Sequence, residues 1–298
     1  MEENVYPTPP CPASGGVIRL QARLTDVSAW MGPAWAALCG VLASGNFDWR
    51  SQDWLRLALL ILLVDGVWGT LWAALGGTNW ATPMRRWRNW RFGQALTPLP
   101  YTLPSSPGDQ TARWLGHLRT WWRDIFWPTC GPAFSAAIVA IPMLAVLGAL
   151  LGIESALLSM AALAVMQLGL AWDGGRGSIS PGWDALIAVT LPWLAGHAAF
   201  APLTLHSFGL ALALALAWGA AWRADLAGER IVGIGAQILS AVLLATLYRP
   251  LAAGTVLLLM IPQLAMFPWF SERQVAARYA RYARPWLMAA MLIAAWAL

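Results

Sequence analysis

The stretch WLRLALLILLVDGVWGTLWAAL, Trp54 to Leu75, decides the fold class of this chain. A helix rises about 1.5 Å per residue, so about 20 apolar residues cross the hydrocarbon core of a bilayer. This stretch is long enough, and its charges are confined to Arg56 near the start and Asp65 in the middle. It therefore predicts a membrane-spanning helix.

The composition of the whole chain agrees with that prediction. Of the 298 residues, 59% are hydrophobic and 11% are charged, whereas about 25% charged residues are usual in soluble domains. The basic residues are all arginine, so phosphate or carboxylate groups would be bound by guanidinium groups. The three cysteines have neither CxxC nor zinc-site spacing. We expect the lipid bilayer as a partner and no nucleic acid.

Further apolar runs, bounded by charges or by Pro, Gly and Asn, predict an all-α polytopic membrane protein with nine spans. The final run is the least regular, because Arg281 and Arg284 near its start have to snorkel to the interface. The nine runs are Ser28–Ser44, Trp54–Leu75, Phe134–Leu151, Ala156–Trp172, Ala185–Phe200, Phe208–Trp222, Ile231–Leu247, Ala252–Phe270 and Tyr279–Leu298.

The arginines predict the orientation of these spans, because basic residues accumulate in short cytoplasmic loops. With the N-terminus inside, most arginines fall on the cytoplasmic side, and Arg50, Arg56 and Arg249 fall on the opposite side. We therefore expect a cytoplasmic N-terminus and an outside C-terminus, in a cell or photosynthetic membrane.

The chain divides into a tail and one membrane domain. We expect residues 1–22 to form a flexible cytoplasmic tail and residues 23–298 to form a single transmembrane domain. Inside that domain, residues 78–131 form the long polar segment, in which apolar residues from Trp114 to Phe126 recur at helical spacing. This pattern predicts an amphipathic helix in the headgroup layer. A membrane anchor is the first interpretation, and a gate over a substrate site is the alternative.

Few side chains could carry chemistry inside the membrane. A carboxylate such as Asp65 in the middle of a span should face a cavity or a partner, or be protonated. His197, near the end of the fifth span, could ligate a metal or the magnesium of a chlorin. For both residues, a hydrogen-bonded position in the interior is the simpler interpretation.

The cytoplasmic corner after the sixth run has the sequence WRADLAGERIVG, Trp222 to Gly233. Asp225 and Glu229 are four residues apart and would share one face of a helix. Together they could hold a divalent cation beside a diphosphate. A solvated loop with internal ion pairs is the alternative.

At these residues the chain resembles the UbiA superfamily of intramembrane prenyltransferases, in its chlorophyll and bacteriochlorophyll synthase branch. The similarity covers nearly the whole chain apart from the tail and Phe92–Gly131. Four segments carry it, namely WAALCGVLASGNFDW (Trp35–Trp49), LPWLAGHAAFAPLTL (Leu191–Leu205), AGERIVG (Ala227–Gly233) and RYARYARPWLMAAML (Arg278–Leu292).

The resemblance implies a nine-helix bundle with a central cavity that opens to the cytoplasm. It also implies transfer of a phytyl or geranylgeranyl group from its diphosphate to a chlorophyllide-type acceptor. In the family, two Asp-rich motifs hold Mg²⁺ against the diphosphate, which stabilises the leaving group. Here the first motif falls on Gly76–Met84, which contains no acid, and the second keeps Glu229 and Arg230 with Asp225 displaced.

The matches to the family's motifs imply a set of site residues. Glu229, Asp225 and Arg230 are the catalytic candidates, and Glu229 with Asp225 could hold at most one Mg²⁺. The cavity candidates are Asp65, Asn79 and His197. The diphosphate-binding candidates are Arg85, Arg86, Arg88 and Arg91.

Two functions follow. The first is a divergent prenyltransferase that acts on a prenyl diphosphate and a chlorin acceptor. The second is a non-catalytic relative that binds a pigment, a quinone or an isoprenoid lipid as an accessory or assembly subunit of a photosynthetic membrane complex. Loss of one electrostatic stabiliser typically lowers a rate by about 10² to 10³, so the missing acids argue against efficient catalysis with Mg²⁺.

Overall fold

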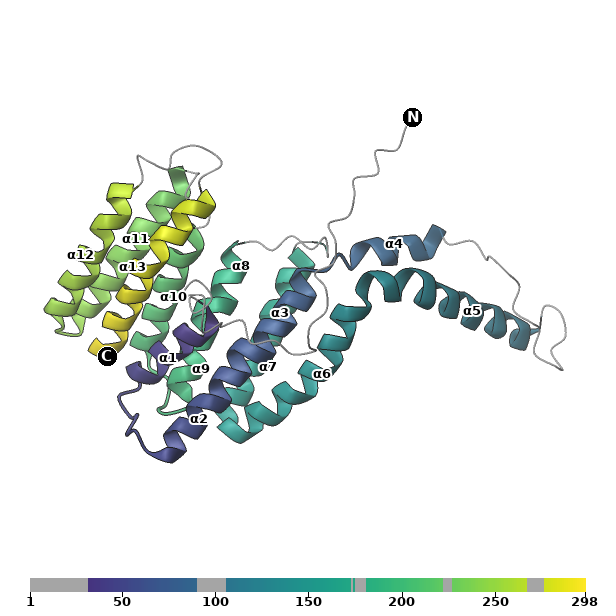
Figure 1. Ribbon diagram of the computed structural model, residues 1–298, viewed down its shortest axis with the longest axis horizontal. Helices are drawn as coiled ribbons and strands as arrows, with labels where there is room; N and C mark the ends of the chain where they lie inside the picture. Colours follow the sequence, from purple (N-terminus) through teal and green to yellow (C-terminus); the bar gives the residue numbers. More distant parts are fainter. Residues whose placement is uncertain (1–31, 90–105, 173, 175–180, 222–226, 267–275) are drawn as a thin grey trace.

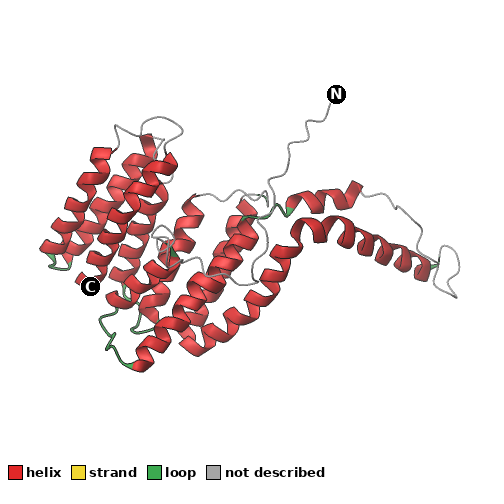
Figure 2. Ribbon diagram, in the orientation of Figure 1, coloured by secondary structure: helices red, strands yellow, loops and turns green. Residues whose placement is uncertain are grey.

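The computed structural model describes residues 32–89, 106–172, 174, 181–221, 227–266 and 276–298. These residues form helices joined by short connections, and within these ranges no strand occurs (Figure 2). The predicted all-α fold is therefore confirmed. The predicted tail at residues 1–22 lies outside the described residues.

The helices follow the order of the apolar runs, and three of them contain a wider, π-helical turn, labelled η (Figure 1). In chain order the elements are α1 (Pro33–Ala43), α2 (Ser51–Ile61), η2 (Leu62–Trp68), α3 (Gly69–Gly76), α4 (Ala81–Asn89), α5 (Pro107–Trp121), η3 (Trp122–Phe126), α6 (Trp127–Leu151), α7 (Ile153–Trp172), α8 (Pro181–Ala185), η4 (Leu186–Thr190), α9 (Leu191–Ala198), α10 (Leu205–Ala221), α11 (Ala227–Thr246), α12 (Pro250–Met266) and α13 (Ala276–Ala297).

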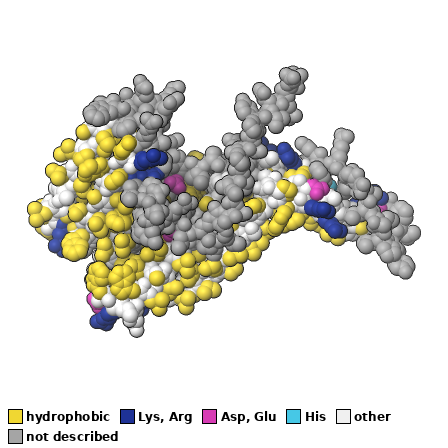
Figure 3. Space-filling view, viewed as in Figure 1, with side chains coloured by type: hydrophobic (Ala, Val, Ile, Leu, Met, Phe, Trp, Pro, Cys, Tyr) yellow, Lys and Arg dark blue, Asp and Glu magenta, His cyan; other side chains and the backbone are white. Residues whose placement is uncertain are grey.

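Four continuous helices in the described ranges are long and apolar enough to cross a membrane. They are Ser51–Gly76, Pro107–Leu151, Ile153–Trp172 and Gly228–Thr246. Helices α1, α10 and α12 are also apolar but shorter. Hydrophobic side chains cover much of the surface in view (Figure 3). These features fit an integral membrane protein, and the count of nine spans stays a prediction.

Two of the wide turns have a local cause in the sequence. Turn η3 is followed by Pro128 and turn η4 by Pro192, in each case two residues after the turn ends. Proline has no backbone N–H and cannot bond the carbonyl four residues earlier, which lies inside the wide turn. The helices therefore continue through these prolines with a locally widened turn.

Helices α1 and α9 approach so closely that only glycine fits at the contact. A Cβ atom on Gly40 would overlap the carbonyl oxygen of Trp193, and a Cβ atom on Gly196 would overlap that of Ala37. Each glycine thus faces the backbone of the other helix. Small residues at helix crossings allow such close approach in membrane proteins.

This helix pair joins two hydrophobic clusters. On α1, Ala36 and Cys39 pack into one cluster with helices α10 to α13, and Val41 packs into the other with α2, η2, α3, α6 and α7. On α9, Trp193 and Ala195 divide between the clusters in the same way. The α1–α9 contact therefore holds the two halves of the bundle together.

Helices α4 and α5 form an arm that projects from the bundle (Figure 1). The indole Nε1 of Trp121 donates a hydrogen bond to the carbonyl oxygen of Pro83 at 3.0 Å, which ties α5 to α4. The amphipathic pattern from Trp114 to Phe126 lies on α5 and η3. These elements continue into α6 without a break, as one helix of 45 residues.

The Gly40–Gly196 contact makes a stability prediction. Alanine at either position should destabilise the fold by about 1–3 kcal/mol, because backbone atoms have to move apart. Gly254→Ala on α12 is the matched control, because a Cβ atom added there would have no other atom within 4 Å outside its own helix turn. Thermal unfolding in detergent should show a lowered midpoint for Gly40→Ala and Gly196→Ala only. Equal midpoints for all three variants would contradict the contact.

Candidate functional site

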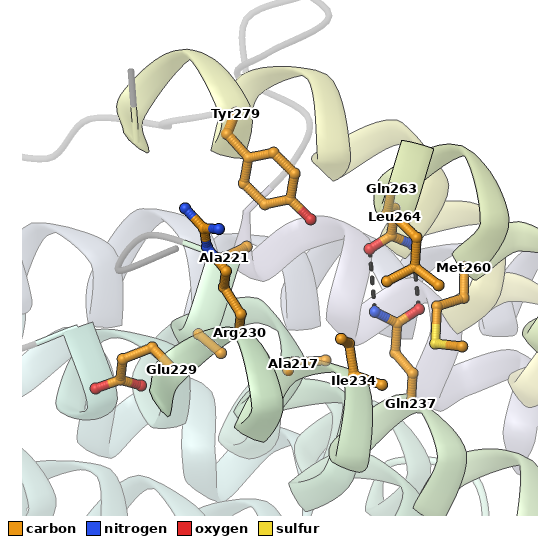
Figure 4. Close-up of a pocket in the computed structure, with 12 residues that line it drawn as sticks. Ala217, Ala221, Glu229, Arg230, Ile234, Gln237, Met260, Gln263, Leu264 and Tyr279 are labelled. Carbon is orange, nitrogen blue, oxygen red and sulfur yellow. Dashed lines mark hydrogen bonds between the residues drawn. The ribbon is translucent and has the colours of Figure 1, made fainter. Parts of the chain in front are cut away.

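The first turn of α11 carries the two described members of the predicted catalytic group. Glu229 and Arg230 are consecutive, so their side chains leave the helix in different directions. Figure 4 shows Glu229 pointing away from Arg230 and Tyr279. Two hollows lie on either side of Glu229, and this residue lines both of them.

The larger hollow is an apolar groove between α8, η4, α10 and α11, with a volume of about 400 Å³. Leu216 and Val232 in its wall are each 46% exposed, so the groove opens sideways between the helices. Among its described lining residues, Glu229 alone is charged. The lining residues are Gly182, Trp183, Ala185, Leu186, Leu212, Ala215, Leu216, Gly219, Ala220, Glu229 and Val232.

The smaller hollow lies between α10, α11, α12 and α13 and has a volume of about 20 Å³, which is room for about one water molecule. Its polar lining comes from Glu229, Arg230, Tyr279, Gln237 and Gln263. In Figure 4, the Tyr279 hydroxyl extends from α13 toward the space between Arg230 and the two glutamines. This hollow suits a water molecule or one small polar group.

The two glutamines form a reciprocal amide pair between α11 and α12. Gln237 Nε2 donates to Gln263 Oε1 at 3.0 Å, and Gln263 Nε2 donates to Gln237 Oε1 at 3.1 Å. Both residues are buried. Each amide therefore satisfies the other, which fixes the register of the two helices at the floor of the smaller hollow.

A second polar group links the two halves of the bundle. Trp72 Nε1 on α3 donates to Asp184 Oδ1 on α8 at 3.1 Å. Arg284 on α13 lies within electrostatic range of Asp184 and stacks over the Trp218 ring on α10, at 5.4 Å from its centroid. Arg284 is half-buried, whereas Arg281 is exposed. The predicted snorkelling of these two side chains stays a prediction.

Asp184 lies one residue before the predicted span. Burial raises the pKa of the Asp184 carboxyl, and the hydrogen bond from Trp72 and the charge of Arg284 oppose that rise. Sequence reasoning missed Asp184 and Arg284 as a pair because they are far apart in the chain. The one signal available was that Asp184 borders one apolar run and Arg284 lies near the start of another.

Of the predicted diphosphate arginines, the three on described residues lie on α4, away from this site. Arg85 and Arg86 are exposed on α4, in the arm at the opposite side of the molecule from α11 (Figure 1). Arg88 lies on the same helix. Arg91 and Asp225 lie outside the described residues.

The three predicted cavity residues lie apart from both hollows. Asp65 is buried in η2. Asn79 is exposed, and its Oδ1 accepts a hydrogen bond from the Thr82 backbone at 3.1 Å, which stabilises the start of α4. His197 is buried, and its Nε2 donates to the Pro202 carbonyl oxygen at 3.2 Å. With Nε2 engaged in this way, His197 fits the interpretation as an interior histidine.

Glu229 is the one described carboxylate beside the two hollows. Across the described ranges, no three His, Cys, Asp or Glu side chains gather into a group that could hold a metal ion. Asp225, the second predicted Mg²⁺ ligand, lies outside the described residues, so the site for one Mg²⁺ stays a prediction.

Comparison with known proteins gives no relative: no protein-family model, no curated protein and no solved structure matches this chain.

The glutamine pair gives a testable coupling. Gln237→Leu should destabilise the protein by about 1–3 kcal/mol, because it leaves the buried amide of Gln263 without its partner. Gln263→Leu should do the same, and the double variant should recover most of the stability. A double-mutant cycle from thermal unfolding in detergent measures this coupling. Additive losses in the double variant would show that the amides act independently.

Proposed function

We propose that this protein is an integral membrane protein that binds an elongated apolar ligand, of the isoprenoid or chlorin-pigment class, in the groove between α8, α10 and α11. In the proposed topology, all nine apolar runs cross the membrane, the N-terminus is cytoplasmic and the C-terminus is outside. The protein then acts as an accessory or assembly subunit of a photosynthetic membrane complex.

The groove is the observation that carries this proposal. Its volume of about 400 Å³ falls within the usual range for small-molecule pockets, and such pockets are mostly apolar with a few polar groups. Trp183, Leu186 and Leu212 supply apolar surface for a chain or a ring, and Trp faces stack well on flat ligands. The partly exposed Leu216 and Val232 mark a lateral entrance, so a ligand could enter from the lipid phase.

Prenyl transfer of the UbiA type is the second candidate. It is favoured by two residues that the resemblance assigns to catalysis: Glu229 lines the apolar groove, and its neighbour Arg230 lines the smaller hollow. An arginine next to a groove for a prenyl chain could bind the phosphates of a prenyl diphosphate. The placement of Arg85 and Arg86 on the arm removes two of the assigned phosphate ligands from this arrangement.

Ligand binding can be tested with the purified protein in detergent. A chlorophyllide-type pigment and geranylgeranyl diphosphate serve as probes, the pigment being followed by its absorbance shift and the diphosphate by equilibrium binding. Leu216→Trp should lower the affinity for the bound probe about tenfold or more, because the larger ring fills the open side of the groove. Leu251→Trp, at an exposed position of α12, is the matched control and should bind as the wild type does.

The same samples separate the two candidates. With both probes and Mg²⁺ present, binding without a prenylated product supports the accessory function. A product that disappears in Glu229→Gln supports prenyl transfer. If neither probe binds, or if Leu216→Trp binds both as well as the wild type does, the groove is not the ligand site.

A further inference from the structure

The arm formed by α4, α5 and η3 has an exposed face that is independent of the groove. On α5 and η3, Trp114, Leu115 and Trp122 are exposed by 53%, 54% and 36%. Together with Leu118 they fall at helical spacing on one stripe. Next to this stripe, Trp121 and His117 of α5 pack on Trp87 of α4, so the arm has a side buried between its two helices and an exposed apolar side.

Basic side chains border this stripe. Arg119 follows Leu115 by four residues and Arg123 follows Arg119 by four, so both guanidinium groups lie along the edge of the stripe, and both are exposed. Arg113 is paired with Asp109 at 2.8 Å. Helix α4 adds the exposed Arg85 and Arg86, so the described part of the arm carries more arginines than acids.

The stripe continues into a surface suited to lipid. Helices α5 and α6 are parts of one helix, and α6 exposes Ile138, Val146 and Leu150 along its length. In Figure 3, hydrophobic side chains follow the lower edge of this helix, and basic side chains appear on the arm. The arm therefore leaves the bundle where an apolar membrane span meets the polar headgroups, the depth at which Trp and Arg are favoured.

We propose that this face of the arm binds the headgroup layer of the bilayer and selects anionic phospholipids through Arg119 and Arg123. The tryptophan and leucine side chains insert between the acyl chains, and the guanidinium groups bind lipid phosphates. Two features favour lipid over a protein partner. The exposed face of the arm is continuous with the lipid-facing side of α6, which a protein-binding surface would not require. The positive charge of the arm complements an anionic leaflet.

Hydrogen exchange in nanodiscs tests the proposal with the full chain. One set of nanodiscs contains phosphatidylcholine, and the other contains phosphatidylcholine mixed with phosphatidylglycerol. Amides of residues 107–123 should exchange about tenfold more slowly in the mixed nanodiscs, because each arginine near an anionic surface adds binding energy. Arg119→Gln/Arg123→Gln should remove this difference, and Arg119→Lys/Arg123→Lys should keep most of it.

Arg56→Gln/Arg249→Gln is the matched control, because it removes two exposed arginines outside the arm. It should leave the lipid dependence unchanged, and circular dichroism should show the same helix content in all variants. Equal exchange in both nanodiscs would overturn the selection of anionic lipids. Rapid exchange in both, with protection appearing only when another membrane protein is added, would assign this face to a protein partner.

Discussion

The close approach of α1 and α9 at Gly40 and Gly196 is the constraint on which the rest of the structure depends. Each glycine lies against the backbone of the other helix and leaves no room for a Cβ atom. The same two helices contribute side chains to both hydrophobic clusters. This backbone-to-backbone contact therefore positions the cluster with helices α10 to α13 relative to the cluster with α2, η2, α3, α6 and α7. Polar links such as Trp72–Asp184 and Trp193–Ser207 add to that contact.

The sequence predicted the helices well, because the signal for an apolar helix is local. The run Trp54–Leu75 lies within the helix Ser51–Gly76, and the amphipathic pattern after Trp114 lies on α5 and η3. The wide turns were not predicted. Those before Pro128 and Pro192 depend on how the helix accommodates the backbone hydrogen bond that proline cannot make, and the one at Asp65 has no such local signal. The length of the helix Pro107–Leu151 was not predicted either, because the sequence separates its polar part from its apolar part.

The candidate site was harder to predict, because it depends on distances between segments far apart in the chain. Glu229 and Arg230, which the resemblance assigned to catalysis, line hollows, and their role there stays a prediction. The arginines of α4 belong to the arm instead, and Asn79 stabilises the start of that helix. The Trp72–Asp184 and Gln237–Gln263 hydrogen bonds join helices whose contacts no local pattern encodes.

The groove between α8, α10 and α11 connects the fold to the proposed function, since its apolar walls, its lateral opening and the carboxylate at its edge suit a ligand taken from the lipid phase. An experimental structure of the protein purified from its native membrane into nanodiscs tests this account most directly. The account predicts an elongated non-protein density in the groove with its polar end near Glu229. A groove closed by the packing of Trp183, Leu212 and Leu216 against one another would contradict it.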